Sequence, residues 1–321
     1  MRGCAAAFVA LVLCAGVAAP QRPPVADHHQ HVASSAIAKL LGAESVKFPV
    51  ITSRDVIAHL DAAGIQRAVL LSLAYMYGSP SRKVDDEYAK VRAENDWTGA
   101  QARQYPERLR AFCGFNPLKE YALDELARCA KEPTLRYGIK LHFGNSDVQL
   151  DVPEHLEQLR RVFRAANEHK MAIVVHLRAS ISKNRPYGPA QARVFLDQLL
   201  PLAPDIPVQV AHLAGSGPGY DDPAADSVMA VLAEAVAKGD PRTRNLWFDV
   251  ASVADLKISA SNAALIAKRI RQVGVARILY GSDAIVGPNL PPRDGWAAFR
   301  RVPLTEQEFN QIAANVAPYL R

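Results

Sequence analysis

The sequence has few cysteines, and none has metal-finger spacing. Four occur in 321 residues, and two of them, Cys4 and Cys14, lie in the first nineteen. This excludes a disulfide framework, a C-x-x-C redox motif and a zinc finger. Cys113 and Cys129 fall on a predicted strand and the helix after it. An oxidising compartment would permit a bridge between them, but we expect two buried free thiols.

The sequence also lacks a block of basic residues. The net charge of +6 comes from scattered arginines without interleaved aromatics, which argues against nucleic-acid binding. It contains no G-x-S-x-G elbow and no H-E-x-x-H helix, which argues against α/β-hydrolase and zincin chemistry. Residues 215–219 read GSGPG, which is neither a dinucleotide-binding turn nor a P-loop.

The first nineteen residues have the layout of a secretory signal peptide. A basic start precedes an apolar run from Cys4 to Val17, and small residues follow at a suitable cleavage site. The run is shorter than the ~20 residues of a membrane span. We therefore predict a signal peptide at 1–19, a mature chain at 20–321, export to a bacterial periplasm and no membrane attachment after cleavage.

Short apolar runs alternate with segments of helical periodicity along the mature chain. The predicted strands are Val25–Val32, Arg67–Ala74, Arg110–Phe115, Tyr137–Phe143, Ala172–Leu177, Pro207–Leu213, Leu246–Ala251 and Arg277–Ser282. Helices are predicted at Val56–Ala63, Glu154–Lys170, Ala224–Ala237 and Leu265–Val273, three of them followed by a glycine stop. Eight such units predict a single-domain (β/α)8 TIM barrel with a parallel sheet. The alternative is an open doubly wound sheet, which usually has a G-x-G-x-x-G turn after its first strand.

Candidate metal ligands lie at the ends of the predicted strands. The first strand contains D-x-H-x-H, in which alternation places His29 and His31 on the same side. His176, His212 and Asp283 occupy the ends of the fifth, sixth and eighth strands. These ends meet at one face of a barrel, where imidazole and carboxylate groups suit zinc or a similar ion. We therefore predict a metal-dependent enzyme in which Asp283 moves a proton.

The motifs D-x-H-x-H, G-I-K-L-H, V-V-H, V-A-H-L-A-G and Y-G-S-D, in this order, resemble the amidohydrolase superfamily. They most resemble its amidohydrolase-related branch, which contains aminocarboxymuconate semialdehyde decarboxylase and its relatives. The resemblance spans residues 25–319. It implies His29, His31 and His176 as metal ligands. It also implies His212 as a ligand or catalytic histidine, and Asp283 as a ligand and proton shuttle.

Three further residues are candidates for the site. In binuclear members of the superfamily a strand-four lysine is carboxylated and bridges two metals, and Lys140 lies on that strand. The resemblance thus implies one divalent ion, expected to be Zn2+, and a second if Lys140 is carboxylated; otherwise this lysine pairs with an acid or binds an anionic substrate. His142 is expected to contact substrate or to pack. Arg178 is expected to bind a substrate carboxylate or to pair with a loop acid.

The predicted function is an exported metal-dependent hydrolase. Its substrate would be a small amide, lactone or ester, with a carboxylate if Arg178 binds one. A metal-dependent decarboxylase or lyase with the same ligand set is the alternative. A catalytically inactive periplasmic binding barrel is a third hypothesis, which the retention of every motif position disfavours. The expected partner is a small-molecule substrate, and a homo-oligomer is left open.

Overall fold

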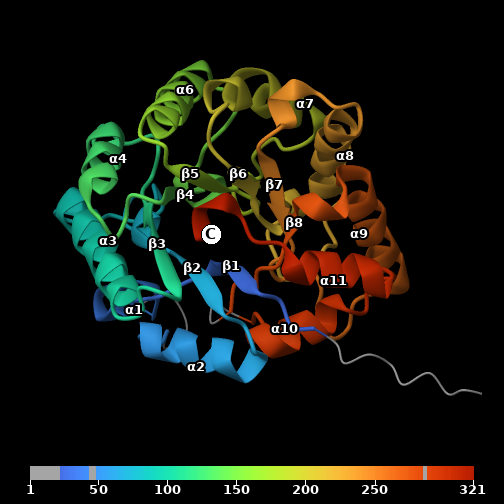
Figure 1. Ribbon diagram of the computed structural model, residues 1–321. Helices are drawn as coiled ribbons and strands as arrows, with labels where there is room; N and C mark the ends of the chain where they lie inside the picture. Colours follow the sequence, from blue (N-terminus) through green and yellow to red (C-terminus); the bar gives the residue numbers. More distant parts are fainter. Residues whose placement is uncertain (1–21, 43–47, 285–287) are drawn as a thin grey trace, which may run out of the picture.

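The computed structural model describes residues 22–42, 48–284 and 288–321, and eight parallel strands surround its centre (Figure 1). The strands are β1 (Ala26–Gln30), β2 (Arg67–Leu71), β3 (Leu109–Gly114), β4 (Gly138–His142), β5 (Ala172–His176), β6 (Val208–Val210), β7 (Leu246–Asp249) and β8 (Ile278–Leu279). Each strand pairs with the next in sequence. Backbone bonds from His28 N to Tyr280 O and from Asp283 N to His29 O join the two ends of the sheet. The predicted single-domain (β/α)8 barrel is confirmed.

Helices cover the outside of the barrel (Figure 1). They are α1 (Ser35–Gly42), α2 (Ser53–Ala63), α3 (Glu87–Arg103), α4 (Ala122–Lys131), α5 (Phe143–Ser146), α6 (Pro153–Glu168), α7 (Pro189–Val194), α8 (Pro223–Ala237), α9 (Ala260–Val273), α10 (Pro292–Phe299) and α11 (Glu306–Ala314). The four predicted helices are confirmed as α2, α6, α8 and α9. At the end of α2, Gly64 adopts a left-handed φ of 70°, as a glycine cap should.

The last residues of the chain close one end of the barrel. Figure 1 shows the C-terminus at the centre of the ring of strands. Leu320 is buried there against Val69, Phe112 and Val174, and Tyr319 packs against the same cluster. This apolar cluster is separate from the larger core between the strands and the helices. Each large side chain buried there contributes roughly 1.5–3 kcal/mol to folding.

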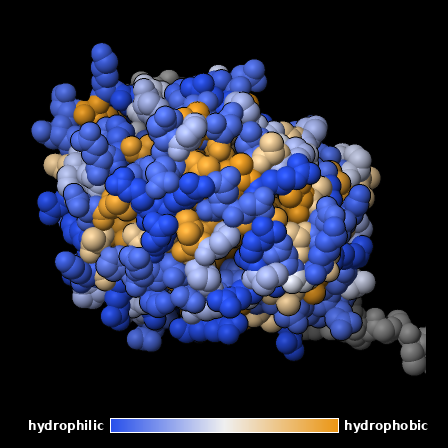
Figure 2. Space-filling model, turned by 90° about the horizontal axis from the view of Figure 1, so that it is seen from above, coloured by the Kyte–Doolittle hydropathy of each residue, from blue (hydrophilic) through white to orange (hydrophobic). Residues whose placement is uncertain are grey.

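The outer surface has the hydrophilic character of solvent-facing helices. Figure 2 shows mainly hydrophilic residues on the face seen from above, with hydrophobic residues exposed in patches between them. Among the described residues, no helix combines the length and the apolar character needed to cross a membrane. The predicted signal peptide at 1–19 lies outside the described residues.

Two cysteines lie at adjoining positions on β3 and α4. Cys113 and Cys129 form a disulfide with a Cα–Cα distance of 6.3 Å. The expectation of two free thiols is therefore wrong. The strand and its following helix pack directly against each other in a β–α unit, which brings the two sulfur atoms together. Spacing along the sequence alone could not show that approach.

Candidate metal centre

The first strand places two consecutive histidines inside the barrel. Pairing between β1 and β2 shifts register between Asp27 and Gln30, which marks an irregularity of the bulge type. His28 contacts the closed end through Ala317, whereas His29 lies among the polar side chains at the other end. Asp27 of the motif is not at the centre of the site. Its carboxylate accepts the backbone N–H groups of His29 and Ser282, and burial raises its pKa to about 6.

Each of three histidines uses its Nδ1 in a hydrogen bond to the surrounding fold. Its other ring nitrogen, Nε2, faces the same small region inside the barrel. His29 Nδ1 donates to Asp249 Oδ2 at 3.0 Å, and His31 Nδ1 donates to the carbonyl of Leu71 at 2.7 Å. His212 Nδ1 donates to the carbonyl of Ala251 at 2.8 Å. Because these acceptors require a proton on Nδ1, each neutral ring presents an Nε2 lone pair.

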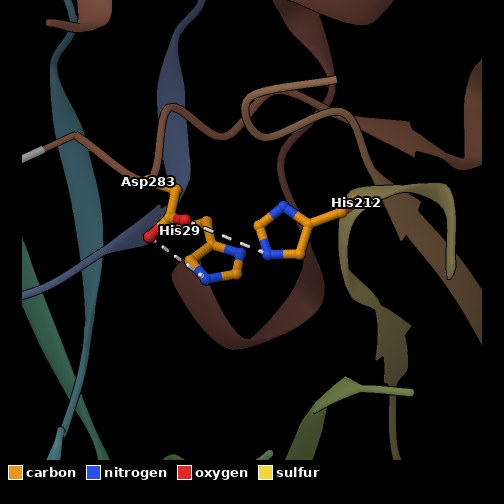
Figure 3. A group of neighbouring side chains, drawn as sticks. All are labelled: His29, His212 and Asp283. Atoms are coloured by element: carbon orange, nitrogen blue, oxygen red, sulfur yellow. Dashed lines mark ion pairs between the residues drawn. The ribbon is translucent and has the colours of Figure 1, made fainter. Parts of the chain in front are cut away.

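Asp283 faces these lone pairs from the segment after β8. Its Oδ1 lies 3.2 Å from His31 Nε2 and 3.8 Å from His29 Nε2, and its Oδ2 lies 4.0 Å from His212 Nε2. Asn289 donates from its side chain to Asp283 Oδ2 at 2.9 Å, which fixes the carboxylate. Figure 3 shows Asp283, His29 and His212 converging from three separate segments. Their ligand atoms all lie within 4.8 Å of one another.

Backbone strain coincides with these side chains. His212 has φ 53° and Asp283 has φ 51°, both in the left-handed region that non-glycine residues rarely adopt. Asp249 stabilises the first of these turns, because its Oδ1 accepts the backbone N–H groups of His212 (2.8 Å) and Ala251 (3.1 Å). Strained residues of this kind cluster at functional sites, where the surrounding fold holds them in place.

The electrostatics favour a charged Asp283 carboxylate beside a neutral His29 ring. Burial alone would raise the pKa of Asp283, but the neighbouring His29 and His31 outweigh it and hold that pKa well below its usual range. Burial, reinforced by the charge of Lys140, lowers the pKa of His29 to about 3. Burial also lowers the pKa of Lys140 to about 8. The site therefore combines an anionic oxygen with imidazole lone pairs.

These residues fit a divalent cation. Among the residues that the structure describes, no hydrogen-bond donor reaches the buried Oδ1 of Asp283. An ionised oxygen of this kind is costly unless a cation binds it. Imidazole nitrogen and carboxylate oxygen are the donor set of zinc, manganese and related ions. His29, His31, His212 and Asp283 could hold such an ion.

The other predicted residues lie around this group. Lys140 Nζ is 3.2 Å from His29 Nε2, so the strand-four lysine does reach the site. His176 lies beside it, with its ring centroid 5.2 Å from that of His212, and stacks on His142 at 3.8 Å. The compact group thus contains His212, which the resemblance implied as a ligand or catalytic histidine, and His176 lies beside it. All five histidines, with Lys140 and Asp283, line a cavity of about 220 Å³.

Arg178 lies at the mouth of the barrel, in the place predicted, but with an acidic partner. Its Nε donates to Asp222 at 2.6 Å, and its guanidinium lies over the ring of Tyr187 at 4.7 Å. Asp222 also caps α8. This is the alternative arrangement, an ion pair with a loop acid. Arg178 still lines an outer cavity of about 340 Å³ together with serines of the βα loops.

Two residues of the site were missed by the sequence reasoning. Asp249 lies at the carboxyl end of β7, where a carboxylate ending a buried strand gives the same signal that identified Asp283. Applying that criterion to every strand would have found it. Asn289 lies in a proline-rich segment after β8 and contacts Asp283 only because that segment turns back over the site. No local pattern points to it.

Comparison with known proteins gives a family match. A sequence model described as amidohydrolase matches residues 60–316, a range that begins after His29 and His31. No curated protein matches the chain.

Several solved structures share the fold. A 5-carboxyvanillate decarboxylase from Sphingomonas paucimobilis has a TM-score of 0.64 at 16% identity, covering 90% of this chain and 96% of that chain. The Novosphingobium aromaticivorans decarboxylase of the same name, determined with bound manganese, has a TM-score of 0.62 at 16% identity, with coverages of 92% and 96%. A probable 2-pyrone-4,6-dicarboxylic acid hydrolase from Acinetobacter baumannii has a TM-score of 0.56 at 19% identity, with coverages of 91% and 96%.

Proposed function

The chain belongs to the amidohydrolase family, and from that premise we propose that it is a metal-dependent hydrolase of small amides, lactones or esters. The observation that carries the proposal is the convergence of three Nε2 atoms on the Asp283 carboxylate, two of them on its unpartnered Oδ1 and the third on Oδ2. In this proposal His29, His31, His212 and Asp283 hold the ion, with His176 next to them. When bound, a divalent ion supplies Lewis-acid activation of water or of a carbonyl oxygen.

Asp283 and His212 are the proposed proton-handling residues. Asp283 Oδ2 accepts a proton from the attacking water and returns it to the leaving group. His212 has two alternative roles. It holds the ion through Nε2, or, where His176 takes its place as the ligand, its protonated Nε2, 4.0 Å from Asp283 Oδ2, stabilises negative charge developing on the substrate oxygen. Asn289 holds the Asp283 carboxylate in one orientation through its hydrogen bond to Oδ2. The wall of histidines and Tyr75 limits access of bulk water.

Lys140 decides the number of ions. Its Nζ lies within 3.2 Å of His29, and no acidic side chain forms a direct ion pair with it among the described residues. We propose one ion, with zinc as the expected metal, and a second if Lys140 is carboxylated. Substituting Lys140→Ala and measuring bound metal by elemental analysis tests this. An unchanged stoichiometry supports the single ion, whereas a fall from two ions to one establishes the bridge.

A decarboxylase is the second candidate function. The decarboxylases from Sphingomonas and Novosphingobium share the fold over at least 90% of this chain, which favours this alternative. Hydroxybenzoate carboxylates assayed for CO2 release, beside lactones and esters assayed for acid release, separate the two. Metal-dependent acid release without CO2 supports the hydrolase, and CO2 release from the carboxylates overturns it.

We also propose export to an oxidising compartment. The Cys113–Cys129 disulfide supports it, since such bonds persist in the periplasm and are rare in the cytosol. Intact-mass analysis of the protein recovered from a periplasmic fraction tests the cleavage after residue 19. Retention of Met1 would contradict it.

The first test of the proposed function is metal content per chain after purification and dialysis. About one bound divalent ion is expected, and His29→Ala should abolish it. A protein that stays metal-free after incubation with Zn2+ and with Mn2+ would overturn the enzymatic interpretation.

A further inference from the structure

The closed end of the barrel is connected to the metal centre by side chains. Three contacts anchor the C-terminal segment there: the backbone N–H of Ala317 donates to His28 Nε2 at 3.1 Å, Arg67 donates to the carbonyl of Leu320 at 2.8 Å, and Asn315 donates to the carbonyl of Ile278 at 2.7 Å. These contacts place Tyr319 at the closed end of the barrel, in contact with Gln209 on β6.

A continuous hydrogen-bond path leads from Tyr319 to His29. The Tyr319 hydroxyl donates to Gln209 Oε1 on β6. Gln209 Nε2 donates to Asp249 Oδ2 on β7 at 2.6 Å, and His29 Nδ1 donates to the same oxygen at 3.0 Å. Gln209, Asp249 and His29 are at most 1% exposed, so water cannot replace the two bonds that join them. The path spans the interior of the barrel. It runs from the C-terminal segment, residues 315–321, which we call the plug, to the metal centre.

Three partners, Tyr319 among them, hold the Gln209 amide in one orientation. An amide group carries an acceptor oxygen and a donor nitrogen on the same carbon. The Asp249 carboxylate and the carbonyl of His28, at 3.3 Å, can only accept, so the nitrogen faces them, and the Tyr319 hydroxyl donates to the oxygen. If the amide rotated by half a turn, its oxygen would face the Asp249 carboxylate, an unfavourable contact in a buried site.

We propose that Tyr319 is a positioning residue for the metal-binding histidine His29, acting through Gln209 and Asp249. The inference rests on the proposed metal centre. Asp249 orients His29 directly, and partners of this kind change metal affinity by about 10- to 100-fold when removed. Tyr319 acts one bond further away. Losing its hydroxyl leaves the ring packing intact and leaves the buried Gln209 Oε1 without its donor, which weakens the hold on the amide that orients Asp249.

The test measures Mn2+ binding by calorimetry in the full-length mature protein. The variants are Tyr319→Phe, Gln209→Met and the double substitution. Tyr137→Phe is the matched control, because Tyr137 packs in the same apolar cluster and lies off the path. Tyr319→Phe is expected to weaken Mn2+ binding by about three- to tenfold, the range for one buried hydrogen bond. Tyr137→Phe is expected to bind as the parent protein does.

The double substitution separates a positioning role from a general structural one. If Tyr319 acts through Gln209, adding Tyr319→Phe to Gln209→Met weakens Mn2+ binding no further. Additive losses would overturn the proposal, as would parental affinity in Tyr319→Phe. The visible spectrum of the Co2+-loaded protein gives a second readout. It should change in Tyr319→Phe and stay unchanged in Tyr137→Phe if the coordination of His29 shifts.

A metal-free measurement distinguishes failure of this inference from failure of the proposed function. In 15N-histidine-labelled protein without metal, His29 should be protonated on Nδ1, and Tyr319→Phe should shift its ring resonances. If these shifts occur while the parent protein binds neither Mn2+ nor Co2+, the path stands and the metal site fails. If the parent protein binds Mn2+ and the resonances do not move, the path fails and the metal site stands.

Discussion

The two ends of the barrel use consecutive histidines in opposite ways. At the closed end, His28 binds backbone atoms with both ring nitrogens, Tyr280 O at 2.9 Å and Ala317 N at 3.1 Å. At the mouth, His29 binds Asp249 with one nitrogen and turns the other toward Lys140 and Asp283. Burial lowers the pKa of His28 to about 4 and that of His29 to about 3, so burial does not distinguish them.

The difference lies in what the second nitrogen meets. Backbone partners of His28 cannot ionise or exchange ligands, so that histidine holds the plug in place. Ionisable side chains surround His29, where a left-handed backbone at Asp283 also holds strain. Polar groups paired within the fold contribute stability, whereas groups left facing an ionised side chain are available for ligands. Burial alone therefore does not identify a functional histidine.

The largest expected effect is on metal binding, and it distinguishes His29 from His28. His29→Ala should weaken binding of Zn2+ or Mn2+ by more than about 100-fold, because it removes a direct ligand and not an outer partner. Elemental analysis after dialysis measures it, with His59→Ala on the partly exposed face of α2 as the control. Full metal content in His29→Ala would remove the contrast between the two ends.

The next effect concerns stability. His28→Ala should lower the free energy of unfolding by about 2–4 kcal/mol, since it leaves a cavity and the buried backbone N–H of Ala317 without a partner. Urea unfolding of the metal-free protein measures it, and metal content should stay at the parental level. A variant that lost its metal with unchanged unfolding would contradict the assignment of His28 to the plug.

The third prediction concerns the stability that the disulfide between β3 and α4 contributes. Replacing both Cys113 and Cys129 by alanine removes a disulfide with a sequence separation of 16, and the expected loss is about 3 kcal/mol. Parallel unfolding of the parent protein with and without reductant provides the control. The metal content should not change, because both cysteines lie in the core between the strands and the helices and not inside the barrel. Loss of metal would show that the link between β3 and α4 affects metal binding at the mouth of the barrel.

The smallest expected effect is a pH dependence at the helix that leads into the plug. Arg271, together with the Thr305 backbone, lowers the pKa of Glu308 from 4.5 to about 2. Since the folded-state pKa is depressed, this stabilisation is present above pH 4.5 and is lost as the pH falls toward 2. The pair is partly exposed, so its contribution is below about 1 kcal/mol. Thermal unfolding of Glu308→Gln should therefore match the parent more closely at low pH than at pH 7.

Much of the fold could be predicted from local patterns. All eight strands occur where apolar runs predicted them, although β6 and β8 are shorter because the chain turns early into the site. The convergence of His29, His212 and Asp283 followed from the rule that parallel strands end at one face. The disulfide, the Arg178–Asp222 pair and the contact of Asn289 with Asp283 could not be predicted. Each depends on the distance between segments far apart in sequence.

The sequence by itself determined the alternation of strands and helices, the family and the kinds of ligand available, because periodicity and residue chemistry are local properties. Only the tertiary structure decided that Asp249 orients His29 and that Asn289 holds the Asp283 carboxylate. It also decided that the chain ends beneath the site, where Tyr319 meets Gln209. These outcomes depend on ring orientation and hydrogen-bond direction in a packed interior, where a shift of about 1 Å breaks a bond.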